Sequence, residues 1–170
     1  MADADTRRPA RPRVPRTLKA RAIGYLARRE YARGELRDKL LAGADAPARE
    51  AVDAVLDELA ALGYLSDARY ANAVVRQKRG GYSRRAIAEA LKARGVAGEV
   101  TADALAEHDL DDATALAALW RRRFGRAPAD EREKARQIRF LASRGFALSA
   151  ILRLLRHPPA DDSGDDPPTR

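Results

Sequence analysis

Two short patterns each occur twice in this chain, and this internal repetition is the feature that most constrains its fold. The pattern Tyr31-x4-Leu36-x3-Leu40 recurs as Tyr82-x4-Ile87-x3-Leu91, and the pattern Leu91-x3-Gly95-Val96 recurs as Leu141-x3-Gly145-Phe146. Self-similarity of this kind is typical of helical repeat proteins, in which neighbouring units bury their apolar faces against one another.

The residues between the two ends of the chain follow a helical pattern throughout. Apolar side chains recur at spacings of three and four, most clearly at Val52, Val55, Leu56, Leu59 and Leu62, and such a stripe marks one buried helix face. Caps and glycines divide the pattern into segments. The sequence predicts nine helices, over residues 17–29, 33–42, 48–62, 66–79, 83–94, 97–107, 111–124, 130–144 and 149–156.

These helices fall into three sets of three, so we expect an all-α protein of three tandem three-helix repeats that resemble helix-turn-helix folds. The expected repeats cover residues 17–65, 66–108 and 109–156. The joints between them are short, which favours an elongated, curved array over one globule. Residues 1–16 form a basic arm and residues 157–170 an acidic tail. Both are expected to be disordered because they hold too few large apolar side chains to offset their chain entropy.

The composition argues against several classes of protein. The chain has no cysteine and only two histidines, so a thiolate nucleophile, a Cys-ligated metal and a histidine relay are not expected. It has no phosphate-binding loop of the Gly-x4-Gly-Lys-Ser/Thr type. Asp109, Asp111 and Asp112 lie where a helix begins, and capping explains them better than a metal site does. We therefore expect no enzyme, no cofactor and no metal.

No apolar stretch is long enough to span a membrane, and the first 16 residues lack the apolar segment of a secretory signal. A soluble protein in the reducing cytoplasm is the expectation.

The net charge of +8 is unevenly distributed along the chain. Residues 17–65 hold 8 basic and 8 acidic side chains, residues 66–108 hold 8 and 5, and residues 109–156 hold 11 and 6. A positive field that grows toward the C-terminal repeat indicates a polyanionic partner, most simply nucleic acid. The alternative is a solvated, arginine-rich surface without a partner.

Four motifs, in order and in register, resemble those of the RecX family, the bacterial regulators of the RecA recombinase. Together they cover the chain from about Leu18 to Leu155. The motifs are Arg28-Arg29-Glu30-Tyr31 with Glu35-Leu36 and Lys39-Leu40; Gly63-Tyr64-Leu65-Ser66-Asp67-x2-Tyr70-Ala71; Gly81-Tyr82-Ser83-x3-Ile87-x3-Leu91-x3-Gly95-Val96; and Phe140-Leu141-x2-Arg144-Gly145-Phe146.

The resemblance implies three tandem three-helix repeats and a non-enzymatic monomer that lies in the groove of RecA–DNA filaments. It implies inhibition of the recombinase, ATPase and co-protease activities of RecA, and thereby a role in DNA repair, recombination and the SOS response. The implied partners are RecA and single-stranded or duplex DNA, without sequence preference. A helix-turn-helix transcription regulator that reads duplex DNA is the alternative.

Arginine clusters are the candidate contacts to DNA or to the RecA filament. Arg132, Arg136 and Arg139 form a stripe on one helix, opposite the apolar residues Ile138, Leu141 and Ala142, which suits a row of phosphate contacts. The run Arg121, Arg122 and Arg123 must place at least two side chains in solvent. For each cluster the alternative is a solvated face without a partner.

A third candidate surrounds Gly80, Gly81 and Tyr82, which are flanked by Arg79, Arg84 and Arg85. The backbone amides near Ser83, at a helix start, could hold an anion there, although a plain turn with a cap explains the same residues. Phe140 lies away from the apolar stripe of its helix, so we expect it to pack against a neighbouring helix, with an exposed hot spot as the alternative. Trp120 is expected in the core.

Overall fold

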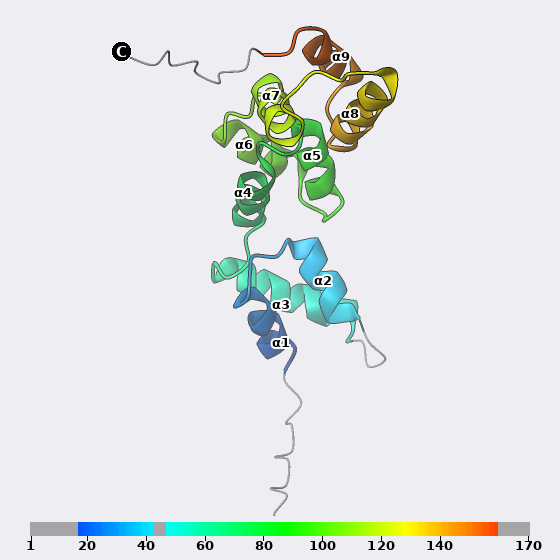
Figure 1. The fold of residues 1–170 in the computed structure, drawn as a ribbon. Helices are drawn as coiled ribbons and strands as arrows, with labels where there is room; N and C mark the ends of the chain where they lie inside the picture. Colours follow the sequence, from blue (N-terminus) through cyan, green and yellow to red (C-terminus); the bar gives the residue numbers. More distant parts are fainter. Residues whose placement is uncertain (1–16, 43–46, 160–170) are drawn as a thin grey trace, which may run out of the picture.

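The computed structural model describes residues 17–42 and 47–159, and within them every regular element is an α-helix (Figure 1). These two ranges contain nine helices, and each overlaps a predicted one with ends that agree within three residues. They are α1 (Leu18–Leu26), α2 (Arg33–Leu41), α3 (Arg49–Ala61), α4 (Asp67–Lys78), α5 (Arg84–Lys92), α6 (Gly98–Glu107), α7 (Asp112–Arg123), α8 (Glu131–Ser143) and α9 (Leu148–Arg156). No helix in these ranges is both long and apolar enough to cross a membrane.

The helices pack in threes, and each set has its own hydrophobic core. We call α1–α3 the first unit, α4–α6 the second and α7–α9 the third. Each core contains fully buried side chains, such as Leu56 in the first unit, Leu91 in the second and Leu141 in the third. The units follow one another along an elongated body, as Figure 1 shows. The predicted basic arm, and all of the predicted acidic tail beyond residue 159, lie outside the described residues.

Side-chain caps start several of these helices where the sequence predicted them. Ser66 Oγ accepts a hydrogen bond from the Arg69 N–H at 3.3 Å. Asp111 accepts from the Ala113 and Thr114 backbone N–H groups and from the Thr114 hydroxyl, and these bonds lower the pKa of its carboxyl group. Asp111 is therefore a helix cap, as its position at a helix start indicated.

The predicted core faces need three corrections. In α1 the spacing of Ala20, Ile23, Leu26 and Ala27 predicts one buried face. The buried residue is instead Ala22, supported by Leu18 and Tyr25, and Ile23 is 40% exposed. Leu62 is 56% exposed, because α3 ends at Ala61 and the chain turns away from the core there. Ala142 is also exposed. In each case a short or helix-terminal segment offers too few turns for periodicity to define its face.

The same hydrogen bond joins each unit to the next. The backbone N–H of Arg33, at the start of α2, donates to Asp67 Oδ1 at the start of α4, over 2.7 Å. The N–H of Arg84, at the start of α5, donates to Asp112 Oδ1 at the start of α7, over 2.8 Å. An amide that its own helix cannot satisfy is thus satisfied by a carboxylate of the following unit.

Glycines allow the backbones of neighbouring units to come into close contact at the same two joints. At the first joint a Cβ on Gly34 would lie 2.8 Å from the Arg94 carbonyl oxygen. At the second joint Gly145, with φ +87°, lies so close to α5 that a Cβ there would be 2.6 Å from both Ala86 Cβ and Ser83 Oγ. Ser83 completes the second joint, because its N–H donates to the Arg144 carbonyl and its hydroxyl to the Gly145 carbonyl, at 3.0 and 2.8 Å.

The first joint has an additional buried carboxylate. Glu35 is 8% exposed and accepts two hydrogen bonds from Arg29, at 2.7 and 3.2 Å, and one from Arg94 of the second unit at 2.8 Å. The hydrogen bonds to Glu35 raise the pKa of Arg29. A buried carboxylate is tolerated here because its oxygens are satisfied by charged donors.

We expect Gly145→Ala to destabilise the third unit more than Gly63→Ala destabilises the first. Both glycines have positive φ, so both substitutions cost about 1 kcal/mol of backbone strain. Only at position 145 does the new methyl group also clash, which adds about 1–3 kcal/mol, since nothing lies within 4 Å of a Cβ at position 63. Thermal unfolding followed by circular dichroism measures the difference. Equal losses would show that the second joint is not tightly packed.

Candidate nucleic-acid interface

The three arginines of the predicted stripe lie together on α8. Arg132, Arg136 and Arg139 are exposed, and with Arg126 from the loop before the helix they line an open hollow of about 520 Å³. Arg126 and Arg136 each donate to Glu133 Oε1 at 3.2 Å. Arg132 and Arg139 form no ion pair with a carboxylate of residues 17–42 or 47–159. The third unit therefore presents converging guanidinium groups to solvent.

The cationic face continues along α8 beyond this hollow. Phe140 and Arg144 follow Arg136 at steps of four residues, which places them on the same side of the helix. The Arg144 guanidinium lies 5.1 Å from the centre of the Phe140 ring and 4.7 Å from that of Tyr82, in the second unit. On Tyr82 it is joined by Lys78, whose Nζ is 4.4 Å from the ring centre. We call this surface, from Arg126 along α8 to Lys78, the α8 face.

The α8 face crosses the joint between the second and third units. With 13 residues, α8 itself extends for about 20 Å. The aromatic rings in this face are half-buried, and Phe140 packs edge-on against Phe124 with ring centres 5.5 Å apart. The expectation that Phe140 packs against a neighbouring helix is confirmed. Trp120 is buried as predicted, and its indole N–H donates to Gln137 Oε1 at 2.9 Å.

The arginine run at the end of α7 divides among different surroundings. Arg123 lies 5.7 Å from the centre of the Phe140 ring and so borders the α8 face. Arg122 reaches back to the second unit, where it donates to the Gly80 carbonyl oxygen at 3.3 Å. Arg121 is exposed and makes no side-chain hydrogen bond or ion pair with a described residue.

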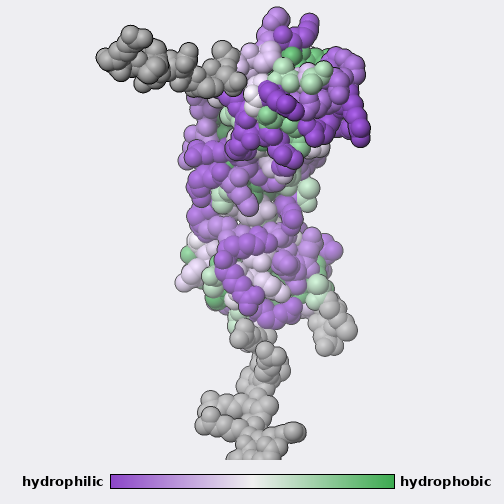
Figure 2. All heavy atoms as spheres, viewed as in Figure 1, coloured by the Kyte–Doolittle hydropathy of each residue, from purple (hydrophilic) through white to green (hydrophobic). Residues whose placement is uncertain are grey.

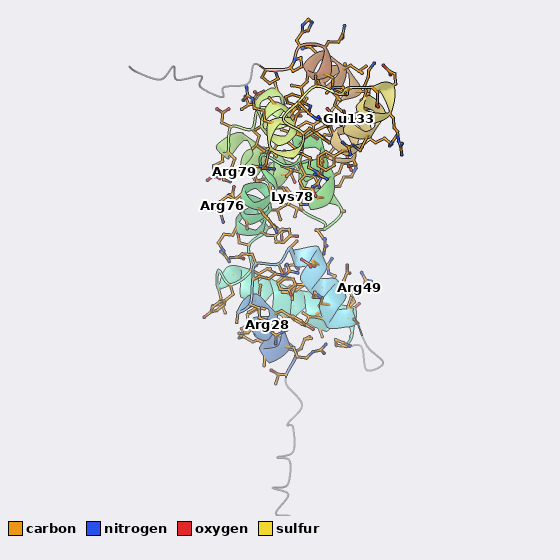
Figure 3. All side chains as sticks on the ribbon, viewed as in Figure 1. Arg28, Arg49, Arg76, Lys78, Arg79 and Glu133 are labelled. Carbon is orange, nitrogen blue, oxygen red and sulfur yellow. The ribbon has the colours of Figure 1, made fainter. Side chains whose placement is uncertain are left out.

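The predicted anion site around Ser83 is not formed. The Ser83 and Arg84 amides donate to Arg144 and Asp112, and the Arg84 guanidinium donates to the Leu110 carbonyl at 3.0 Å. These groups join two units, so they are not free to bind an anion. Arg79 and Arg85 are exposed on either side of this turn; Figure 3 labels Arg79 and Lys78 at the end of α4.

Sequence reasoning missed four members of the α8 face, namely Lys78, Arg126, Glu133 and Arg144. The position of Arg144, three steps of four residues after Arg132, was a readable signal. Arg126 was not predictable, because only the path of the loop before α8 brings it to the hollow.

Among residues 17–42 and 47–159, no cluster of histidine, aspartate and glutamate is arranged to hold a metal ion. In the view of Figure 2, hydrophilic residues cover most of the surface.

Comparison with known proteins identifies the family. A family model described as "RecX, second three-helix domain" matches residues 66–105, and one described as "RecX, third three-helix domain" matches residues 110–155. The "Regulatory protein RecX" of Ralstonia pickettii (strain 12J) is 41% identical over 85% of this chain and 89% of its own length. That of Leptothrix cholodnii is 44% identical over 82% of this chain and 88% of its own length. The chain belongs to the RecX family.

Solved structures of RecX proteins share the fold. The crystal structure of RecX from Lactobacillus salivarius superposes with a TM-score of 0.61 at 20% identity, over 82% of this chain and 94% of that one. A second crystal structure, of a regulatory protein RecX, gives a TM-score of 0.63 at 21% identity, over 82% of this chain and 71% of that one. The relatives are named as regulatory proteins, not as enzymes.

The charge of the α8 face predicts how the protein binds DNA in the absence of other proteins. We expect binding to be weak, independent of sequence and strongly dependent on salt. Three to four arginine–phosphate contacts give a slope of about −2 to −3 in a plot of log K against log salt for a single strand. Fluorescence anisotropy with labelled oligonucleotides measures this slope. A flat salt titration, or a strong preference for one duplex sequence, would contradict the expectation and favour a transcription regulator.

Proposed function

We propose that this protein is a non-enzymatic regulator that binds RecA–DNA filaments and inhibits the recombinase, ATPase and co-protease activities of RecA. In this way it would limit recombination and the SOS response during DNA repair in the cytoplasm. Membership of the RecX family supports the RecA partner. The observation that carries the proposal is the continuous cationic face of α8, which crosses from the third unit to the second.

The α8 face suits a filament groove for three physical reasons. It is about 20 Å long on α8 alone, so it can contact several phosphates in succession. Its charges lie on helices and a packed joint, which hold them in a fixed order. Its arginines follow one another along one side of a helix, and such a row suits the successive phosphates of the DNA backbone, which carry no sequence information.

The charge-balanced first unit is proposed to contribute little to DNA contact. Several of its cations form ion pairs within the unit. Arg37 pairs with Asp53, Arg33 with Asp57, and Lys19 with Glu58. A carboxylate beside a cation offsets part of the attraction of that cation for a phosphate. The proposed contribution of each unit to DNA contact therefore increases with its net charge, from the first unit to the third.

Reversing three charges of the α8 face tests the proposed function. The triple variant Arg132→Glu, Arg136→Glu, Arg139→Glu should raise the concentration that half-inhibits the DNA-dependent ATPase of RecA by at least about tenfold, because attraction to phosphate becomes repulsion. The fold should persist, since all three side chains are exposed and the buried Leu141 is unchanged. Circular dichroism and thermal unfolding verify this.

The matched control is the triple variant Arg28→Glu, Arg49→Glu, Lys92→Glu. These cations are exposed as well, and they belong to the first and second units. The control makes the same change of six charges, but away from the α8 face. The concentration that half-inhibits the RecA ATPase should therefore rise by less than about threefold, because only the long-range attraction to DNA is weakened. Equal losses in the two variants would mean that only net charge matters. No inhibition of RecA by the parent protein, at any ratio, would exclude the proposed function.

A further inference from the structure

One carboxylate lies at the centre of the arginines of the α8 face. Glu133 Oε1 accepts from Nη2 of Arg126 and from Nη2 of Arg136, both at 3.2 Å, and Oε2 accepts from the Ala129 backbone N–H at 2.9 Å. All four of these residues line the same hollow, together with Arg132, Arg139 and Asp130. The Asp130 carboxylate caps α8, where its Oδ1 accepts from the Glu133 backbone N–H at 2.6 Å. Figure 3 labels Glu133 on α8. A negative group in the middle of a cationic surface requires an explanation.

The donors hold this carboxylate ionised and in place. The Ala129 N–H, together with the positive charges of Arg126 and Arg136, lowers the pKa of Glu133. Its side chain is only 18% exposed, whereas Glu131, two residues earlier, is 88% exposed and pairs with Lys134 instead. Glu133 is therefore a fixed anion, and Glu131 is an ordinary surface charge on the same turn of the helix.

A carboxylate and a phosphodiester present the same feature to arginine, namely two anionic oxygens that a guanidinium can bind. Two guanidinium groups and a backbone N–H already converge on the Glu133 carboxylate. Arg132 and Arg139 line the same hollow without a carboxylate partner among the described residues. This is a set of donors that one phosphate group of a nucleic-acid backbone would use.

We propose that the hollow is a subsite for one backbone phosphate, and that the Glu133 carboxylate occupies the position of this phosphate in the free protein. The inference rests on the proposed function, since it names the group that the α8 face binds. A phosphate that enters the hollow must displace the carboxylate from Arg126 and Arg136. Glu133 is thus an internal competitor that keeps the affinity of the free protein for DNA low, so that binding depends on additional contacts, such as those of a filament.

The test compares Glu133→Gln with Glu131→Gln for binding to a labelled single-stranded oligothymidylate, measured by anisotropy at fixed salt. The two variants remove the same charge from the same helix turn. Glu133→Gln should bind at least about threefold more tightly than the parent, which is the effect of removing one charge about 6 Å from a phosphate in a water-like dielectric. Glu131→Gln should change the affinity by less than about twofold, because that charge is solvated and paired with Lys134.

Two results would overturn the inference. Weaker binding by Glu133→Gln would mean that Glu133 positions the arginines instead of competing with the ligand. Equal effects of the two variants would mean that Glu133 acts only through net charge. In either case, inhibition of the RecA ATPase by the parent protein would leave the proposed function intact, whereas a parent that does not inhibit RecA would refute that function whatever the two variants show.

Discussion

The hydrogen bond from the first amide of α2 or α5 to an aspartate of the next unit is the constraint on which the arrangement of the units depends. Arg33 with Asp67, and Arg84 with Asp112, form this bond at 2.7 and 2.8 Å. It satisfies a donor that a helix start leaves open, and it fixes where the following unit begins. The glycine turns at positions 95 and 145 then allow close contact of the two backbones. Repetition of this joint turns three small cores into one elongated array.

The second joint also determines how the charges are arranged. Contact of α5 with the turn after α8 places Tyr82 beside Arg144, and Gly80 within reach of Arg122. The cationic surface of the third unit is thereby continued onto the second. The first joint instead uses its arginines internally, because Arg29 and Arg94 both bind the buried Glu35. The two joints share their backbone geometry but differ in the charge that they leave for a partner.

Much of this fold could be predicted from the sequence, because long amphipathic helices and caps are local signals. The starts of α4, α5 and α7 followed from Ser66, Ser83 and Asp111, whose side chains do accept backbone hydrogen bonds. Short α1 was predicted as a helix but with the wrong buried face, since nine residues define a stripe poorly. In the α8 face, the sequence spacing of Arg132, Arg136 and Arg139 was a local pattern, and it placed these three side chains correctly on one side of the helix.

The remaining features of the α8 face and of the second joint depend on contacts between residues that are distant in the sequence. Ser83 was expected near an anion but is used for the joint, because only the packed structure brings Arg144 and Gly145 to it. Arg126 and Glu133 meet through a loop whose path no local pattern specifies. Neighbouring residues determine where helices form and, in the longer helices, which face is buried. Tertiary packing determines the partners of individual charges.

The chain contains no cysteine, so a single introduced cysteine can carry a photo-cross-linker without background. Ser143→Cys places it on the exposed line of α8 next to Arg139, and Ala54→Cys places a control on the exposed side of α3. In complexes with RecA–DNA filaments, the α8 face predicts cross-links to the DNA strand from position 143 and none from position 54. Cross-links to DNA from position 54 but not from position 143 would contradict the central claim that the α8 face meets the nucleic-acid backbone.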